Sequence, residues 1–289
     1  MRVKGDERLA WLRFACVQEF PVSLLVALLQ EFQLPEAVFD VPQRLLVKSV
    51  GEKWARELQS QDVLEKAKEC ERWLDKTPNA GIVTITEPDY PRPLLQAGIA
   101  PAVLFYRGNR ALLSRKSVGI VGTQAPDREG IDNAWNFAKA IGARGISVVT
   151  TLTAGVAQWA AQSALKAGVG TIGVAPCGID RCFPTAQKVL YQQISKEGLV
   201  VSAFAPGQAF TEGNVRNQAE LLVGLVDGVL VVQSQPNDVN ARIAKLAGEW
   251  GRDVFVIPGS IHSPQYKGNH RLIRQGATLV ESVDDLLER

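Results

Sequence analysis

The sequence predicts a doubly wound α/β fold, in which a mainly parallel sheet carries helices on both faces and follows a small all-helical domain. From Val118 onward, short runs rich in β-branched residues alternate with segments whose apolar residues recur at helical spacing. Before residue 77 only helical patterns are found. Because parallel neighbouring strands need a crossover connection, such alternation is typical of a doubly wound sheet.

The amino-terminal part predicts a helical domain over residues 1–76. Helical patterns cover residues 9–14, 22–32, 35–39 and a charged amphipathic stretch at 61–73. Turn-forming residues are dense between Lys76 and Gly81, so we expect a second domain over 77–289.

Beyond this boundary the sequence period changes from helix to strand. Residues 82–85 and 103–106 predict strands, and two prolines between Asp89 and Leu95 predict an extended link. Further strands are expected near 118–121, 146–150, 170–175, 198–202, 228–232 and 253–257. Helices are expected near 128–143, 155–167, 184–196, 216–225 and 239–250.

The segment from Ser117 to Gly130 predicts a strand, a tight turn and a helix. Gly122 follows the apolar strand and leaves the backbone free of a side chain where N–H groups at the helix start are unpaired, so this turn can receive a phosphate. A lone glycine falls short of the G-x-G-x-x-G fingerprint, and a simple turning role for Gly122 stays an alternative.

Composition and charge restrict the possible functions. Among 289 residues the formal charge is only +2, from 32 basic and 30 acidic side chains, so a nucleic-acid contact has to come from a local patch. The four cysteines form no C-x-x-C pair, and the amino terminus is charged without a secretory signal, which predicts reduced thiols in a cytoplasmic protein. The strongest apolar run, 221–232, contains Asp227 and is too short to span a bilayer.

The turns after the predicted strands carry glycines, hydroxyls and amides but no cluster of carboxylates and histidines. The chain has only two histidines, His262 and His270, and neither lies near a cysteine in sequence, so no metal site is expected. No G-x-S-x-G elbow and no acid–base pair is visible, so we expect no catalytic residues. Asp180 and Asp238, the only acids in these turns, are expected to close turns or cap helices.

Several motifs resemble, in order and spacing, those of the DprA/Smf family of DNA-processing proteins. They are Asp89-Tyr90-Pro91 with its continuation to Leu95, Leu104 to Asn109, Ser117 to Gly122, Cys177 to Pro184, Gly251 to His262, and Gly268 to Ala277. The resemblance covers roughly residues 80–285 and is strongest from Gly251 to Ala277.

This resemblance implies an extended Rossmann-like fold that binds and protects single-stranded DNA. It also implies loading of a RecA-type recombinase in natural transformation, usually by a homodimer, with no enzyme activity, no cofactor and no membrane contact. The helical part resembles the small SAM or helix-hairpin-like domain of that family. The winged-helix domain that many members carry at the carboxyl end is not expected here.

Three parts of the family's DNA pocket are altered in this chain. Gly122-Thr123-Gln124 stands where the family has Gly-Ser-Arg, and the turn at 151–157 keeps Gly155 but lacks the family's Arg and Asp. The family's Arg-Asn-Arg falls on Gln218-Ala219-Glu220 or, with a two-residue shift, on Arg216-Asn217-Gln218. Because each lost phosphate contact weakens binding, a weakened or retuned pocket is expected.

The residues that still suit DNA binding lie in the turns and helix starts. Phe183 suits stacking on a base, with a buried core ring as the alternative, and the basic cluster at 267–274 has solvated surface charge as its alternative. Backbone N–H groups at Gly122-Thr123 and Gly155 are expected to seat a phosphate. The predicted set is Gly122, Thr123, Gln124, Gly155, Arg181, Phe183, Lys188, Arg216, Asn217, Lys267, His270, Arg271 and Arg274.

Two other functions stay open at this point. A divergent paralogue that binds a protein partner fits the loss of cations from a retained framework. A protein that binds or hydrolyses a nucleotide-derived ligand fits the fold, although the Pro-Gly-Gly-x-Gly-Thr turn typical of such enzymes is absent.

Overall fold

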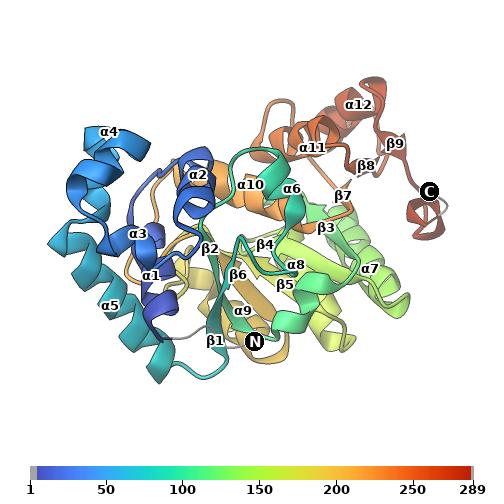
Figure 1. The fold of residues 1–289 in the computed structure, drawn as a ribbon. Helices are drawn as coiled ribbons and strands as arrows, with labels where there is room; N and C mark the ends of the chain where they lie inside the picture. Colours follow the sequence, from blue (N-terminus) through green and yellow to red (C-terminus); the bar gives the residue numbers. More distant parts are fainter. Residues whose placement is uncertain (1–4, 288–289) are drawn as a thin grey trace.

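Helices alone make up the amino-terminal part of the computed structural model, which describes residues 5–287. They are α1 (Gly5–Cys16), α2 (Val22–Phe32), α3 (Ala37–Asp40), α4 (Gln43–Leu58) and α5 (Gln61–Lys76). In Figure 1 these helices, coloured blue to teal, lie at one end of the sheet. Helix α4 was not expected, because its helical pattern is interrupted at Gly51, where φ is 81°.

One sheet forms the rest of the fold. Its strands are β1 (Ala80–Thr84), β2 (Val103–Gly108), β3 (Ser117–Val121), β4 (Ser147–Thr151), β5 (Thr171–Val174), β6 (Leu199–Ser202), β7 (Gly228–Val231), β8 (Asp253–Val256) and β9 (Thr278–Leu279). They lie in the order β1-β2-β6-β5-β4-β3-β7-β8-β9. Neighbours from β6 to β9 pair parallel, whereas β2 pairs antiparallel with both β6 and β1. The predicted doubly wound, mainly parallel sheet is confirmed; only β9 was not expected.

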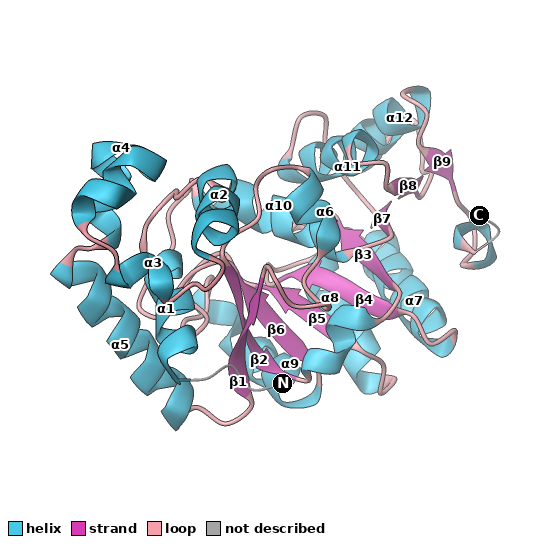
Figure 2. Cartoon of the chain, viewed as in Figure 1, coloured by secondary structure: helices cyan, strands magenta, loops and turns pink. Residues whose placement is uncertain are grey.

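Helices cover both faces of this sheet (Figure 2). They are α6 (Arg92–Gln96), α7 (Arg128–Ala143), α8 (Val156–Lys166), α9 (Lys188–Glu197), α10 (Asn214–Leu225), α11 (Val239–Glu249) and α12 (Lys267–Arg274), with short 3₁₀ turns at Arg110–Ser114 (η1), Thr185–Gln187 (η2), Pro264–Tyr266 (η3) and Asp284–Leu286 (η4). Helix α8 packs between α7 and α9, while α10 packs against α11. The crossovers from β3 to β6 proceed toward one edge of the sheet, and those from β6 to β8 proceed toward the other edge. Because crossovers of this kind are right-handed, these two groups of helices lie on opposite faces.

The link between β1 and β2 corrects one expectation. Two prolines predicted an extended chain from Asp89 to Leu95, yet Arg92–Gln96 form α6 with Pro93 in its first turn. Proline is tolerated there because the first N–H groups of a helix have no acceptor within the helix. Tyr90 just before it is buried, and its hydroxyl donates to the Pro101 carbonyl at 2.8 Å.

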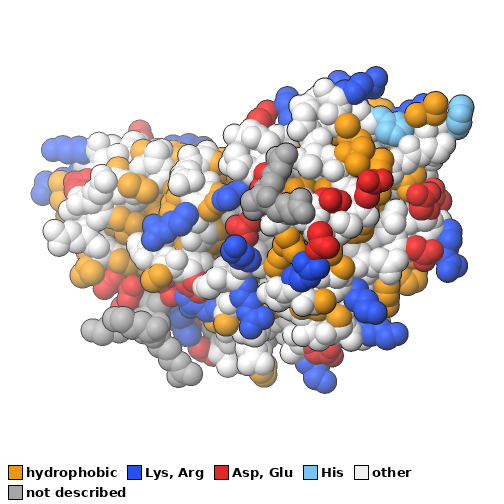
Figure 3. All heavy atoms as spheres, turned by 90° about the vertical axis from the view of Figure 1, so that its right-hand side faces the viewer, with side chains coloured by type: hydrophobic (Ala, Val, Ile, Leu, Met, Phe, Trp, Pro, Cys, Tyr) orange, Lys and Arg blue, Asp and Glu red, His pale blue; other side chains and the backbone are white. Residues whose placement is uncertain are grey.

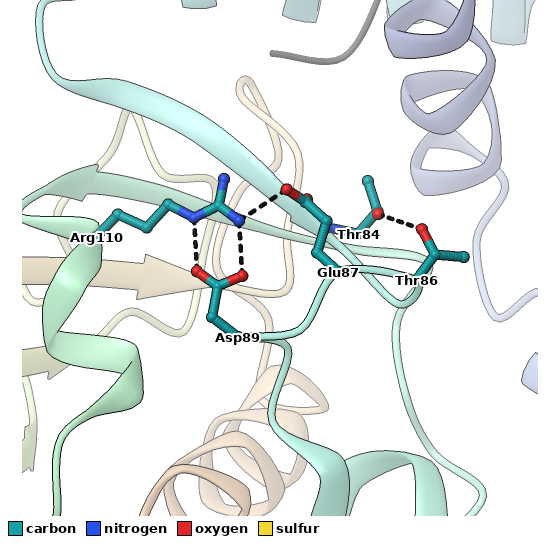
Figure 4. Close-up of polar contacts among 5 residues, drawn as sticks. All are labelled: Thr84, Thr86, Glu87, Asp89 and Arg110. Carbon is teal, nitrogen blue, oxygen red and sulfur yellow. Dashed lines mark hydrogen bonds and ion pairs between the residues drawn. The ribbon is translucent and has the colours of Figure 1, made fainter. Parts of the chain in front are cut away.

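An ion-pair network fixes the same link (Figure 4). The Arg110 guanidinium donates to both carboxylate oxygens of Asp89 at 2.7 and 2.6 Å, and to Glu87 at 2.7 Å. Glu87 also accepts the Thr84 N–H at 2.8 Å, and the Thr84 and Thr86 hydroxyls lie 2.9 Å apart. Hydrogen bonds from Arg110, together with its charge, hold the pKa of Asp89 below its usual range. The loop after β1 is thereby tied to the segment after β2.

The change from helices to strands falls between Lys76 and Ala80. Leu74 of α5, Val83 of β1 and Leu104 of β2 belong to one continuous buried cluster. Because this buried cluster contains residues from both sides of the boundary, the division into domains at 1–76 and 77–289 stays a prediction. Within residues 5–287, no helix has both the length and the apolar composition that crossing a membrane requires.

Candidate functional site

A hollow of about 450 Å³, here called the Phe183 hollow, opens where the loops after β5 and β6 meet the start of α9. It is lined by Arg107 from β2, by Cys177, Asp180, Arg181, Cys182 and Phe183 from the loop after β5, by Thr185, Lys188, Tyr191 and Gln192, and by Ala209 and Phe210 from the loop after β6. The structure thus brings three predicted residues, Arg181, Phe183 and Lys188, into one site.

A stacked aromatic pair forms one wall of the hollow. The rings of Phe183 and Phe210 lie 3.7 Å apart between centroids, with only 7° between their planes. Phe183 is 40% exposed, so its alternative interpretation as a core residue is wrong. Because the ring remains accessible while Phe210 supports it, Phe183 can offer a surface on which a base stacks.

Hydrogen bonds to backbone carbonyls hold the loop after β5 in place. The Ser202 hydroxyl donates to the Cys177 carbonyl at 2.7 Å, and the buried Asn214 amide donates to the Pro176 carbonyl at 2.8 Å. The Tyr191 hydroxyl donates to the Ile179 carbonyl. Strand β6 and helices α9 and α10 therefore position the wall that carries Arg181 and Phe183.

The charged side chains of the hollow are mainly basic. Arg107, Arg181 and Lys188 line it together with one carboxylate, Asp180, which lies 3.9 Å from the Arg181 guanidinium. Asp180 also accepts the Gly207 N–H at 2.8 Å and so joins the loop after β5 to the loop after β6, whereas the sequence predicted that it would close a local turn or cap a helix. Asp238, the other acid of these turns, caps α11 by accepting the Ala241 N–H at 2.8 Å.

The two thiols of the hollow add no negative charge at neutral pH. Burial raises the pKa of Cys177 to about 11, and burial also raises the pKa of Cys182. Both groups are therefore protonated, and the hollow suits an anion. In the part of the chain that the structure describes, no three His, Cys, Asp or Glu side chains are grouped to hold a metal ion.

The turns at the topological switch point are packed by the chain itself. Strand β3 lies between β4 and β7, and the Thr123 N–H that follows it donates to the Gln233 carbonyl at 2.8 Å. The Thr123 carbonyl accepts the Val156 N–H at 3.1 Å. The expectation that the Thr123 N–H seats a phosphate is therefore wrong, because this N–H is already used.

Close packing also explains the glycines of these turns. Gly155 has φ of 76°, and a Cβ on it would lie 2.4 Å from the Thr123 carbonyl oxygen. A Cβ on Gly122 would lie 2.7 Å from the Val156 side chain. Gln124 is exposed beside them. A phosphate contact from Gly122, Gln124 or Gly155 stays a prediction.

Two of the predicted residues lie on the first turn of α10. Arg216 and Asn217 are exposed, whereas Gln218 is buried and donates to the Val174 carbonyl at 2.6 Å. Arg216 donates to the Glu220 carboxylate at 2.8 Å. This ion pair lies at the surface and contributes little, so a phosphate contact from Arg216 or Asn217 stays a prediction.

The basic residues Lys267, His270, Arg271 and Arg274, here called the α12 cluster, lie apart from the hollow. Lys267, His270 and Arg274 line a second hollow with Pro258, Ile261, Ile273 and Leu279. This second hollow is beside β8 and β9, on the other side of β3 from β5 and β6. Figure 3 shows the histidines, in pale blue, at one corner of the molecule beside basic and apolar side chains.

Asn269, within this same segment, has a structural role that the sequence analysis missed. Its side chain is fully buried, and its carbonyl accepts from the Ser234 N–H at 2.8 Å and the Ser234 hydroxyl at 3.0 Å. Its amide donates to the carbonyls of Val232 at 2.9 Å and Ile257 at 2.8 Å. Asn269 thereby joins α12 to the ends of β7 and β8.

The sequence analysis also missed Arg107 and Phe210 as residues of the Phe183 hollow. Arg107 lies in the Leu104 to Asn109 motif, and Phe210 lies in the loop after β6. Only the folded chain places them beside Phe183.

Comparison with known proteins agrees with this architecture. The sequence pattern of the DNA recombination-mediator protein A family matches residues 81–289. Protein Smf of Synechocystis sp. is 32% identical over an alignment of 292 positions, which covers 98% of this chain and 72% of that protein. The DNA processing protein DprA of Streptococcus pneumoniae is 33% identical over 204 residues, which cover 71% of this chain and 72% of that protein.

Solved structures show the same likeness. The X-ray structure of DNA processing protein A from Streptococcus pneumoniae aligns with a TM-score of 0.82 and 26% identity, covering 99% of this chain and 98% of that one. The Helicobacter pylori protein, described for its single-stranded DNA binding mode, shares the fold at a TM-score of 0.65 and 23% identity, over 71% of this chain and 94% of that one. The resemblance predicted from the motifs is confirmed, and the chain belongs to the DNA recombination-mediator protein A family, which includes the DprA and Smf proteins.

Proposed function

We propose that this protein binds and protects single-stranded DNA without catalysing a reaction on it. The observation that carries the proposal is the exposed Phe183–Phe210 pair in a hollow that Arg181 and Lys188 also line. Aromatic rings beside cations are the usual means of holding single strands, since every base has a face to stack and every nucleotide a phosphate. Relatives named as DNA processing proteins, and a homologue described for its single-stranded DNA binding mode, support this function.

The binding that follows from this site is nearly indifferent to base sequence. A ring stacks on any base, and phosphate contacts position a strand without reading it. Because the whole chain carries a formal charge of only +2, binding depends on local cations, and it weakens as salt screens them.

Fluorescence anisotropy with labelled oligo-dT tests the proposal. We expect binding that tightens with oligomer length, weakens steadily with salt and favours single strands over a duplex of the same length. A parallel thermal-shift screen with nucleotides separates the alternatives. Stabilisation by a nucleotide without oligo-dT binding would favour a nucleotide-derived ligand, and no response to either would favour a protein partner.

The finer parts of the proposal follow from family membership. We propose that the protein acts as a homodimer and loads a RecA-type recombinase onto the bound strand during natural transformation. Light scattering coupled to size exclusion measures the mass in solution. Recombinase filament formation on strands covered by single-strand-binding protein, with and without this protein, measures loading.

A cytoplasmic location is also part of the proposal. Cys177 and Cys182 are free thiols that line the Phe183 hollow, and free thiols persist in a reducing compartment. Labelling of the thiols in intact cells, compared with lysed cells, would check this location.

A further inference from the structure

Arg107 reaches the Phe183 hollow from a part of the sheet that lies outside the parallel core. It is on β2, where it pairs in register with Ala80 of β1 and Val200 of β6. Its side chain lines the hollow with Tyr191 and Gln192 of α9, which packs against β2. Burial raises the pKa of Tyr191, and the neighbouring Arg107 charge opposes that shift, as expected for a guanidinium close to the phenol.

The charge of Arg107 has no partner within residues 5–287. No carboxylate there forms an ion pair with Arg107, although the residue is half-buried. Arg110, three residues later and similarly buried, is held by Glu87 and Asp89. A guanidinium that loses part of its hydration normally gains an anion in exchange, so the missing partner of Arg107 points to an anion from outside the chain.

The surroundings of Arg107 define the class of that anion. A guanidinium presents a planar fork that matches the two oxygens of a phosphate or a carboxylate. Lys188 lines the same hollow without an ion pair among the described residues, and the stacked Phe183–Phe210 pair forms another wall. A ligand that offers a phosphate and a flat ring together meets all of these groups, and a nucleotide unit does so. The volume of about 450 Å³ falls within the range of pockets that hold small molecules.

We propose that Arg107 is a phosphate-binding residue of the single-stranded DNA site and that the hollow receives one nucleotide unit, its base on Phe183 and its phosphate at Arg107 and Lys188. This inference rests on the proposed function and adds a contact supplied by β2.

The test is a salt titration of oligo-dT binding by fluorescence anisotropy. Arg107→Gln is expected to bind on the order of tenfold more weakly at low salt, because a charge-assisted contact is lost. The slope of log affinity against log salt should fall by about 0.7, the value for one phosphate on a single strand. The control is Arg56→Gln, which removes the same charge from an exposed residue of α4 and should change neither quantity.

Arg107→Lys distinguishes charge from geometry. It keeps the positive charge, so the salt slope should stay near the wild-type value while affinity falls several-fold, because a lysine cannot form the two-point fork. If Arg107→Gln does not fold, Arg107→Lys still tests the proposal. Wild-type affinity of Arg107→Lys for oligo-dT would overturn the two-point contact between the Arg107 guanidinium and a phosphate.

The outcomes separate this inference from the proposed function. Wild-type protein that does not bind oligo-dT at any salt would overturn both. Wild-type binding that a folded Arg107→Gln variant shares, in affinity and in salt slope, would overturn only the assignment of Arg107. Inorganic phosphate competing with oligo-dT for the wild-type protein more strongly than for Arg107→Gln would support a phosphate at this residue.

Discussion

Replacing Phe183 by alanine is expected to weaken single-stranded DNA binding while leaving the fold intact. The ring is 40% exposed and stacks on Phe210, so its loss removes an aromatic pair worth about 0.5–1.5 kcal/mol of stability. Truncating a core phenylalanine costs about 3–5 kcal/mol instead. The free energy of unfolding should therefore fall by the smaller amount.

The effect on DNA binding is larger than the effect on stability. One base that stacks on an aromatic ring contributes about 1–3 kcal/mol, which corresponds to a roughly 5- to 150-fold increase in Kd when the ring is removed. Because the phenyl ring carries no charge, the dependence of log Kd on log salt should keep its wild-type slope. Phe183→Trp, which keeps a stacking surface, should retain binding.

Anisotropy titrations with oligo-dT at several salt concentrations measure both quantities, and urea denaturation measures stability. Leu34→Ala is a suitable control, since Leu34 is also an exposed apolar residue, at 56%, but follows α2 far from the hollow in sequence. A folded Phe183→Ala variant that binds as tightly as wild type at every salt concentration would refute the stacking role. Loss of fold would show that the ring supports the loop after β5.

Further experiments test other parts of the structure. Replacing the three Lys and Arg residues of the α12 cluster by glutamine should lower the salt slope by up to about two units, at about 0.7 per phosphate, and an unchanged slope would mark solvated surface charge. Arg110→Ala should lower the free energy of unfolding by about 1–3 kcal/mol in urea, because it leaves two partly buried carboxylates without a counter-ion; wild-type stability would contradict this. Since Arg110 lowers the pKa of folded Asp89, that pair stabilises the protein fully above the unfolded pKa of about 3.9 and loses its effect as pH falls through the lower folded value, so the difference between wild type and variant should shrink in acid. Limited digestion with trypsin should cut first after Lys76 if residues 1–76 and 77–289 are separate domains, whereas first cleavage inside the sheet region would argue against that division.

Much of the fold could be predicted from the sequence because its signals are local. The β-branched run at β3 and the helical spacing of α7 each depend on residues a few positions apart, and both appear where they were expected. Strand–helix alternation then implies a parallel sheet, because the connections must cross over. Local signals misled at Arg92–Gln96, where proline in a first helical turn was interpreted as an extended chain.

The candidate site depended on contacts that the sequence does not show. Phe183 stacks on Phe210, which lies 27 positions away in the sequence. The Thr123 N–H is unavailable to a ligand because it donates to the carbonyl of Gln233, which is also distant in the sequence. Strand order separates the α12 cluster from the Phe183 hollow, although both follow strands of one sheet.

The sequence by itself therefore determined most of the elements, the parallel sheet and the family, because each rests on local spacing or on ordered motifs. Only the tertiary structure decided which side chains share a site. Arg107 illustrates the reason: it lies on an added antiparallel strand, and its place beside Tyr191 follows from the pairing of β2 with β6 and the packing of α9 on both. Such long-range packing is set by the whole fold rather than by any segment of the chain.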